Sequence, residues 1–274
     1  MVTAETLARL DAVSPYFTLA VGPRPDADAF RPLADLHRSP AVLDEYVDEV
    51  ARSLATRQRR VAASTLHLGV AARLWSVALG VLAFTGRVPD LDPERLHWRR
   101  VESGPLPPWL PEQPGGELAH TTRAAPTTPA APNPAPAPTT RAAPNPAPAP
   151  TTRAAPNPAP APTTPAADAL AATVLAATLD PLGAAMRARY GLSAHVLRGN
   201  AASALVGAAR MLHTRAAGAP HPTLPAVTTL LTTGPLAQAG EFTPAPIAYR
   251  RRNCCLYYRV PGAGICGDCV LRRA

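Results

Sequence analysis

Residues 249–274, called the cysteine segment below, contain all four cysteines of the chain. Cys254 and Cys255 are adjacent, ten residues follow them, and Cys266 and Cys269 are separated by two residues. Four thiolates this close in sequence can bind zinc or an iron–sulfur cluster. Thiol redox chemistry through Cys266 and Cys269 is a third possibility. A disulfide between the adjacent pair would be strained.

The adjacent pair bears on the choice between these metals. A zinc knuckle takes two ligands from one tight turn, with the spacing that Cys266 and Cys269 have. The side chains of Cys254 and Cys255 diverge instead, because successive residues of extended backbone point to opposite sides. A cluster with two iron atoms has less need of a knuckle at both ends. The spacing therefore favours an iron–sulfur cluster and leaves zinc open, with a turn at 261–264 folding the connection back.

The cysteine segment resembles the C-terminus of the FhuF-type ferric siderophore reductases. The resemblance rests on the pattern Cys-Cys-x10-Cys-x2-Cys, and HLGVAARLW (His67–Trp75) and GNAASALVGAAR (Gly199–Arg210) are also similar to the helical part of that family. It implies a mainly helical, cytoplasmic protein that reduces siderophore-bound Fe(III) to Fe(II). It also implies that a [2Fe–2S] cluster is the cofactor, with all four cysteines as its ligands: Cys254, Cys255, Cys266 and Cys269.

The expected partners follow from this reading. The hard oxygen ligands of a siderophore hold Fe(III) more firmly than Fe(II), so one electron would release the iron of a bound ferric siderophore. Gly262–Gly267 matches the G-x-G-x-x-G fingerprint, but only seven residues follow it, too few for a dinucleotide-binding unit. We therefore expect an external electron donor of the ferredoxin or flavoprotein type.

Two other functions fit the same residues. One is a non-catalytic helical binding module stabilised by zinc, with the proline-rich stretch as its docking feature. The other is an iron–sulfur electron carrier that never acts on a siderophore. Metal content distinguishes the first of these from a reductase, and an assay with ferric substrates distinguishes the second.

The chain has a net charge of +8, from 27 basic and 19 acidic residues. All 27 basic residues are arginines, and lysine is absent. Residues 250–274 hold six of these arginines and one acid, Asp268. Nearby cations favour the reduced, more anionic state of a cluster, although a solvated surface explains them equally well. No nucleic-acid-binding module frames them, so no nucleic-acid partner is expected.

The longest apolar run, Leu66–Phe84, has Arg73 at its middle, which argues against a membrane span. The N-terminus lacks the basic region and apolar core of a signal peptide. We therefore expect a cytoplasmic protein.

Hydrophobic spacing predicts a mainly α fold with a short β or irregular segment at 95–101. Helices are expected from Ser39 to about Arg59, over Leu66–Phe84 with Gly86 as its end, and over Thr223–Leu231. Three more are expected to start at Asp168, at Asp180–Pro181 and at Ser193. Asn200 lies among the apolar positions of the last one. It either bonds backbone as a buried amide or holds the cysteine segment against the helices.

The domain organisation is set by a proline-rich insert. The unit TTRAAPNPAPAP occurs twice in succession, at 139–150 and 151–162, and has no apolar surface to bury. We expect this insert to be a disordered polyproline II spacer, with a docking arm as the alternative. The predicted parts are an N-terminal helical part (1–118), the insert (119–167), a C-terminal helical part (168–248) and a [2Fe–2S]-binding segment (249–274).

Overall fold

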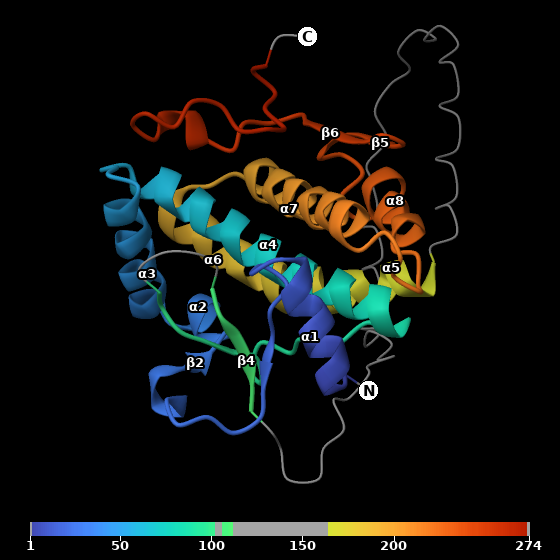
Figure 1. Cartoon of the computed structure of the whole chain (residues 1–274). Coiled ribbons are helices and arrows are strands. Elements are labelled where there is room, and N and C mark those ends of the chain that lie inside the picture. Colours follow the sequence, from blue (N-terminus) through green and yellow to red (C-terminus); the bar gives the residue numbers. More distant parts are fainter. Residues whose placement is uncertain (1, 102–105, 112–163, 273–274) are drawn as a thin grey trace, which may run out of the picture. The chain divides into compact units, whose positions relative to one another are not determined.

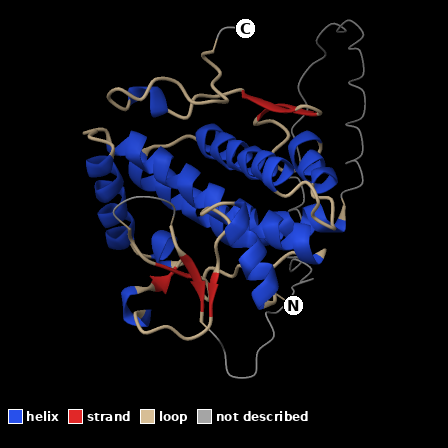
Figure 2. Cartoon of the chain, in the orientation of Figure 1, coloured by secondary structure: helices blue, strands red, loops and turns tan. Residues whose placement is uncertain are grey.

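The computed structural model describes residues 2–101, 106–111 and 164–272 (Figure 1). The described residues before and after the insert belong to one unit. Most of the predicted insert, residues 119–163, lies outside the described residues. Figure 2 shows that helices dominate, with two small sheets beside them, so the predicted mainly α fold class is confirmed.

The first two predicted helices are present, but the first ends earlier than about Arg59 and the second starts before Leu66. Helix α3 (Pro40–Ser53) starts as expected, because the Ser39 hydroxyl accepts the Val42 N–H and proline occupies the first turn. It ends at Ser53 and not near Arg59, since the backbone turns at Ala55, where φ is 49°. Arg59 instead begins helix α4 (Arg59–Thr85), which ends at Gly86 in the left-handed conformation.

Helix α4 runs through the hydrophobic core, and Trp75 at its middle is fully buried. Two helical stretches, Arg59–Thr85 and Pro165–Tyr190, are long and apolar enough to cross a membrane by length and composition. Within the fold, 72% of the most apolar window of the first and 44% of that of the second are buried. The buried Arg73 guanidinium donates to the backbone carbonyls of Pro15 and Thr18. Arg73 therefore fastens α4 to the N-terminal part of the chain.

The helix after the insert differs from the prediction. It begins at Pro165, capped by the Thr164 hydroxyl, so Asp168 lies in its first turn and is not the cap. The α5 turns (Pro165–Leu170), a π-helix (Ala171–Leu179) and α6 (Asp180–Tyr190) follow without a break. The expected new start at Pro181 is therefore wrong. The wider π turn moves the carbonyl four residues back away from the proline ring, which would otherwise break the helix.

The next two helices were predicted correctly. Helix α7 (Ala194–Arg215) is capped by Ser193, whose hydroxyl accepts the Val196 N–H, and α8 (Leu224–Thr232) follows. In Figure 1, α7 lies along α4, and small buried residues such as Ala201 and Ala208 allow this close packing.

Short strands and N-terminal elements complete the fold. A four-stranded sheet has the order β1 (Ala20–Val21), β4 (Pro108–Leu110), β3 (His97–Trp98) and β2 (Arg31–Pro32), with β1 and β4 parallel. The helices α1 (Ala4–Val13) and α2 (Asp35–Arg38) lie in the stretch left unassigned by the sequence. The expected strand at 95–101 is thus present as β3, with Leu96 and Trp98 buried.

A hairpin of β5 (Gly240–Pro244) and β6 (Ile247–Arg251) leads into the cysteine segment. Residues 240–248 are therefore not helical, contrary to the prediction for the part 168–248. The short strands carried no helical period, and the proline-containing turn between them concealed the pairing. The hairpin delivers the cysteine segment onto the surface formed by α4 and α7 (Figure 1).

Candidate cysteine-ligated metal centre

Backbone hydrogen bonds fold the cysteine segment back on itself. The Arg251 N–H at the end of β6 donates to the Asp268 carbonyl at 3.0 Å, which joins the start of the segment to its last turn. The Cys269 N–H donates to the Cys266 carbonyl at 3.2 Å and closes that turn. The Ala263 N–H donates to the Val260 carbonyl within the intervening bend. The predicted turn near 261–264 therefore brings the two cysteine pairs together.

All four cysteines are free thiols in this structure. The Sγ atoms of Cys255 and Cys266, one from each pair, lie 3.5 Å apart. The other two thiols each accept a backbone N–H from two residues further on: Leu256 N–H to Cys254 Sγ and Leu271 N–H to Cys269 Sγ, both at 3.3 Å. Such bonds stabilise a sulfur that carries negative charge.

The thiols also affect one another electrostatically. Burial raises the pKa of Cys254, and the charges of Cys255 and Cys269 raise it further, while the Leu256 N–H opposes them. Burial, the hydrogen bond with Cys255 and the charges of Cys255 and Cys269 raise the pKa of Cys266 to about 12. The four sulfurs therefore share one electrostatic site. Thiols in such a group lose their protons readily only when a cation binds among them.

The separation of Cys255 Sγ and Cys266 Sγ suits two ligands of one metal atom within a four-cysteine centre. Among the described residues, no group of three or more His, Cys, Asp or Glu side chains is arranged to hold a single metal ion. A structural zinc ion needs four ligands around one point, whereas a [2Fe–2S] cluster bound by four cysteines spreads them over two irons. Two thiolates on one tetrahedral metal, at about 2.3 Å each, lie roughly 3.8 Å apart. The separation of 3.5 Å between Cys255 and Cys266 is close to that value.

A buried arginine lies beside the thiols. The Arg251 side chain is 1% exposed and donates to Asn200 Oδ1 at 2.7 Å, Asn253 Oδ1 at 3.1 Å and the Val196 carbonyl at 3.3 Å. Its Nη1 atom has no partner in the described structure, and none of the groups that bond the guanidinium is a carboxylate. A buried guanidinium stays charged, so it requires negative charge nearby. An anionic group held by the four thiolates meets this requirement, and the residues present fit such a group.

The helices hold the cysteine segment through a small set of polar contacts. The Ser64 hydroxyl on α4 donates to the Cys255 carbonyl at 2.8 Å, and the Asn200 amide on α7 donates to the Ser64 carbonyl at 2.9 Å. Asn200 also accepts from Arg251. Both readings of Asn200 are therefore correct: it bonds backbone, and it holds the cysteine segment. Sequence reasoning missed Ser64, which carries no signal other than being a polar residue on an apolar helix.

Asp268, the only acid of the cysteine segment, is also tied to α7. It accepts hydrogen bonds from the Ser203 hydroxyl and from Arg210 Nη1, the latter an ion pair at 3.0 Å. Gly199 permits the close approach of the segment, because an added Cβ would lie 2.4 Å from Asn253 Oδ1 and 2.8 Å from Arg251 Nη2. These contacts attach the cysteine segment to α7 along much of the length of that helix.

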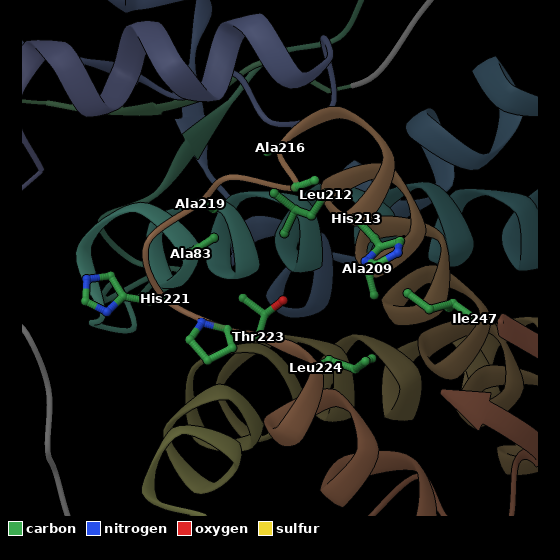
Figure 3. Close-up of a pocket in the computed structure, with 12 residues that line it drawn as sticks. Ala83, Ala209, Leu212, His213, Ala216, Ala219, His221, Thr223, Leu224 and Ile247 are labelled. Atoms are coloured by element: carbon green, nitrogen blue, oxygen red, sulfur yellow. The ribbon is translucent and has the colours of Figure 1, made fainter. Parts of the chain in front are cut away.

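Two pockets lie apart from the thiols. Figure 3 shows a pocket of about 230 Å³ where the C-terminal end of α7 meets α8, with His213 and His221 on different sides of it. A second pocket, of about 300 Å³, is lined by His67, Arg187 and Arg198 and by part of the π-helix. No cysteine lines either pocket. His213 lies on α7 and His221 on the loop before α8, and their side chains do not converge in Figure 3.

The fold and the site together define a mainly helical protein with a cysteine-ligated centre on a C-terminal segment. Residues 251–271 match the family model described as the FhuF 2Fe-2S C-terminal domain. The match identifies this segment as similar to the FhuF 2Fe-2S domain and supports a [2Fe–2S] cluster as its cofactor. No curated protein matches the chain. The match spans all four cysteines, whose assignment as the cluster ligands stays a prediction.

Proposed function

We propose that this protein is a cytoplasmic ferric-siderophore reductase, which passes one electron to siderophore-bound Fe(III) and releases Fe(II). The observation that carries the proposal is the gathering of four thiols on a segment that matches the FhuF 2Fe-2S domain. When bound, the [2Fe–2S] cluster supplies a one-electron donor. Cys254, Cys255, Cys266 and Cys269 are the residues that would hold it.

The residues around the thiols leave room for a bulky ferric complex. Cys254 and Cys266 are half-buried, whereas Cys255 and Cys269 are buried. Side chains are absent at Gly262, Gly264 and Gly267, and an added Cβ at any of these would meet nothing within 4 Å. A site covered by so little protein lets a large chelate approach without any movement of the helices.

Arg251 has a separate role in this proposal. Burial raises the pKa of Cys254 and of Cys266, and the positive charge of Arg251 partly opposes that rise. The same charge stabilises a centre that becomes more negative on reduction, so it raises the tendency of that centre to accept an electron. Its hydrogen bonds to Asn200 and Asn253 hold the guanidinium in place while this charge changes.

The test begins with protein purified without air. Iron, zinc and sulfide are assayed on one sample, and visible spectra are recorded before and after dithionite. The reduced protein is then mixed with a ferric tris-hydroxamate and a ferric tris-catecholate in the presence of a chromogenic Fe(II) chelator. We expect about two irons and two sulfides per chain, visible absorption that bleaches on reduction, and Fe(II) release that reoxidises the protein.

Other results assign the chain to a different function. Zinc without iron would make it a zinc-stabilised binding module. A bleachable cluster that neither chelate reoxidises would make it an electron carrier with another acceptor. Recovery of the tagged protein outside the cytoplasmic fraction would contradict the proposed location.

A further inference from the structure

The outer surface of the cysteine segment combines exposed apolar and cationic side chains. In the part of the chain that the structure describes, four large hydrophobic side chains are exposed, and three of them belong to this segment: Tyr258 (44%), Ile265 (45%) and Leu271 (55%). Since single exposed apolar residues are ordinary but their concentration is not, this part of the surface is suited to contact another molecule.

Four exposed arginines lie on the same segment: Arg250, Arg252, Arg259 and Arg272. Together with the three apolar residues they are called the arginine face. None of the four forms an ion pair in the described structure, where each bonds at most to neutral groups such as the Gln58 and Gln238 amides. Among the residues that the structure describes, ten other arginines do pair with acids: Arg9, Arg24, Arg38, Arg52, Arg59, Arg95, Arg99, Arg100, Arg189 and Arg210.

The positive charge extends beyond the segment and is not offset within it. Arg259 donates to Gln58, and the neighbouring Arg57 and Arg60 are exposed and without an ion pair in the described residues. Asp268 does not compensate this charge, because Arg210 and Ser203 already bind its carboxylate. Arg252 and Arg259 flank the Cys254–Cys255 pair in sequence, and the Arg272 N–H donates to the carbonyl of Cys269 at 3.2 Å. The arginine face therefore adjoins the thiols.

We infer that the arginine face is the docking site of the electron donor, and that this donor is a small one-electron carrier protein with an acidic surface. The inference rests on the proposed redox function. Charge complementarity selects an acidic partner and speeds its encounter. Three apolar side chains amid arginines match the composition of a protein contact, in which aromatic residues and arginine are enriched. In the transfer step the reduced carrier loses one electron, the oxidised cluster gains it, and no bond or proton changes.

The experiment uses the cluster-loaded protein and flavodoxin, an acidic flavoprotein, as the probe. Binding is measured by titration at low and at high salt. Electron transfer from the flavodoxin hydroquinone is followed by stopped-flow absorbance of its semiquinone, with no siderophore present. We expect salt to weaken binding, and we expect the double variant Arg259→Glu/Arg272→Glu to raise the dissociation constant by about tenfold or more, with a similar fall in the rate of transfer.

The matched control is Arg87→Glu/Arg215→Glu, which makes the same change in net charge. Both residues are exposed and lack an ion pair in the described structure, and Arg87 follows the far end of α4, roughly 40 Å from Gln58 for a helix of that length. Reduction by dithionite serves as the second control, because it needs no docking surface. We expect the control variant to bind flavodoxin nearly as wild type does, and we expect both variants to react normally with dithionite.

Three outcomes would overturn the inference. The first is unchanged flavodoxin binding in the Arg259/Arg272 variant. The second is an equal loss in the control variant, which would reduce the effect to net charge. The third is an Arg259/Arg272 variant that no longer binds a gallium-loaded siderophore but still binds flavodoxin, which would make the arginine face a substrate site. Because siderophore is absent from the transfer assay, a protein that fails to reduce siderophores can still pass this test.

Discussion

The hydroxyl of Ser64 donates a hydrogen bond of 2.8 Å to the backbone carbonyl of Cys255, across 191 residues of sequence. Asn200 bonds the carbonyl of the same serine and also accepts from Arg251. The cysteine segment is thereby attached to both α4 and α7 at the position of its thiols. The helical part thus serves as the support of the metal centre, with no cysteine of its own.

The variant Ser64→Ala tests this attachment. It leaves the Cys255 carbonyl buried without its partner, which costs about 1–3 kcal/mol in the free energy of unfolding. We expect faster loss of the cluster to an iron chelator, measured by the decay of visible absorbance, together with a lower denaturation midpoint. Ser76→Ala, at another buried serine of α4, is the control. Equal cluster lifetimes in the two variants would argue against the support role.

Two glycines of α7 should respond in opposite ways to alanine. Alanine normally stabilises a helix interior by up to about 1 kcal/mol over glycine, and Gly207 has open space around it. At Gly199 the new methyl group would collide with Asn253 and Arg251. Gly207→Ala should therefore raise the melting temperature, while Gly199→Ala should lower it and weaken cluster retention. Stabilisation by both would show that the segment does not sit against Gly199.

The contacts at Gly199 show what the sequence could and could not provide. The cysteine spacing, the caps at Ser39 and Ser193 and the long α4 were predictable, because each depends on residues close together in sequence. The roles of Ser64 and Arg251 depend on the packing of α4, α7 and β6 against one another. Sequence reasoning treated Arg251 as one of six similar arginines, yet it alone among Arg250–Arg252 is buried.

The missed strands have a related cause. Two-residue strands such as β1 and β2 are too short to show alternation, and the β5–β6 hairpin pairs residues on both sides of a proline turn. The continuous helix over Pro165–Tyr190 was divided in the prediction because Pro181 resembles a start signal. A π turn before the proline is a tertiary solution that periodicity of 3.6 residues does not reveal.

Arg251 offers a test of buried charge near the thiols. Replacing it with methionine removes a positive charge beside a centre that becomes more negative on reduction, so the reduction potential should fall. Arg251→Lys keeps the charge and should restore much of the potential while losing some hydrogen bonds and stability. Arg252→Met, at an exposed neighbour, should change the potential little because solvent screens its charge. The measurement is a spectroelectrochemical titration, and equal potentials for the two methionine variants would contradict this role.

The ligand set can be tested one cysteine at a time. Serine is a poor thiolate substitute, so each single variant, Cys254→Ser, Cys255→Ser, Cys266→Ser and Cys269→Ser, should lose the cluster or hold an altered one. Visible spectra and iron-to-sulfide ratios of protein purified without air provide the measurement. A variant that keeps the wild-type spectrum and iron content would remove that cysteine from the ligands.

The buried His67 should make the free energy of unfolding depend on pH. This fully buried imidazole on α4 has its pKa lowered to about 4 by burial, while a hydrogen bond to the Leu179 carbonyl acts in the opposite direction. In the unfolded chain its pKa is about 6.5, so below that pH the unfolded state binds a proton that the folded state does not. Stability should fall as pH drops from 6.5 toward 4, by at most about 1.4 kcal/mol per pH unit.

The variant His67→Gln isolates this contribution, because glutamine does not titrate. Denaturant unfolding of wild type and variant at pH 7.5, 6.5, 5.5 and 5.0 gives the difference in stability between them at each pH. His195 on α7 is exposed, and His195→Gln is the control. We expect the loss of stability between pH 6.5 and 5.0 to be smaller in His67→Gln than in wild type and in the control. Parallel pH profiles for all three proteins would mean that His67 accepts a proton in the folded state as easily as in the unfolded chain.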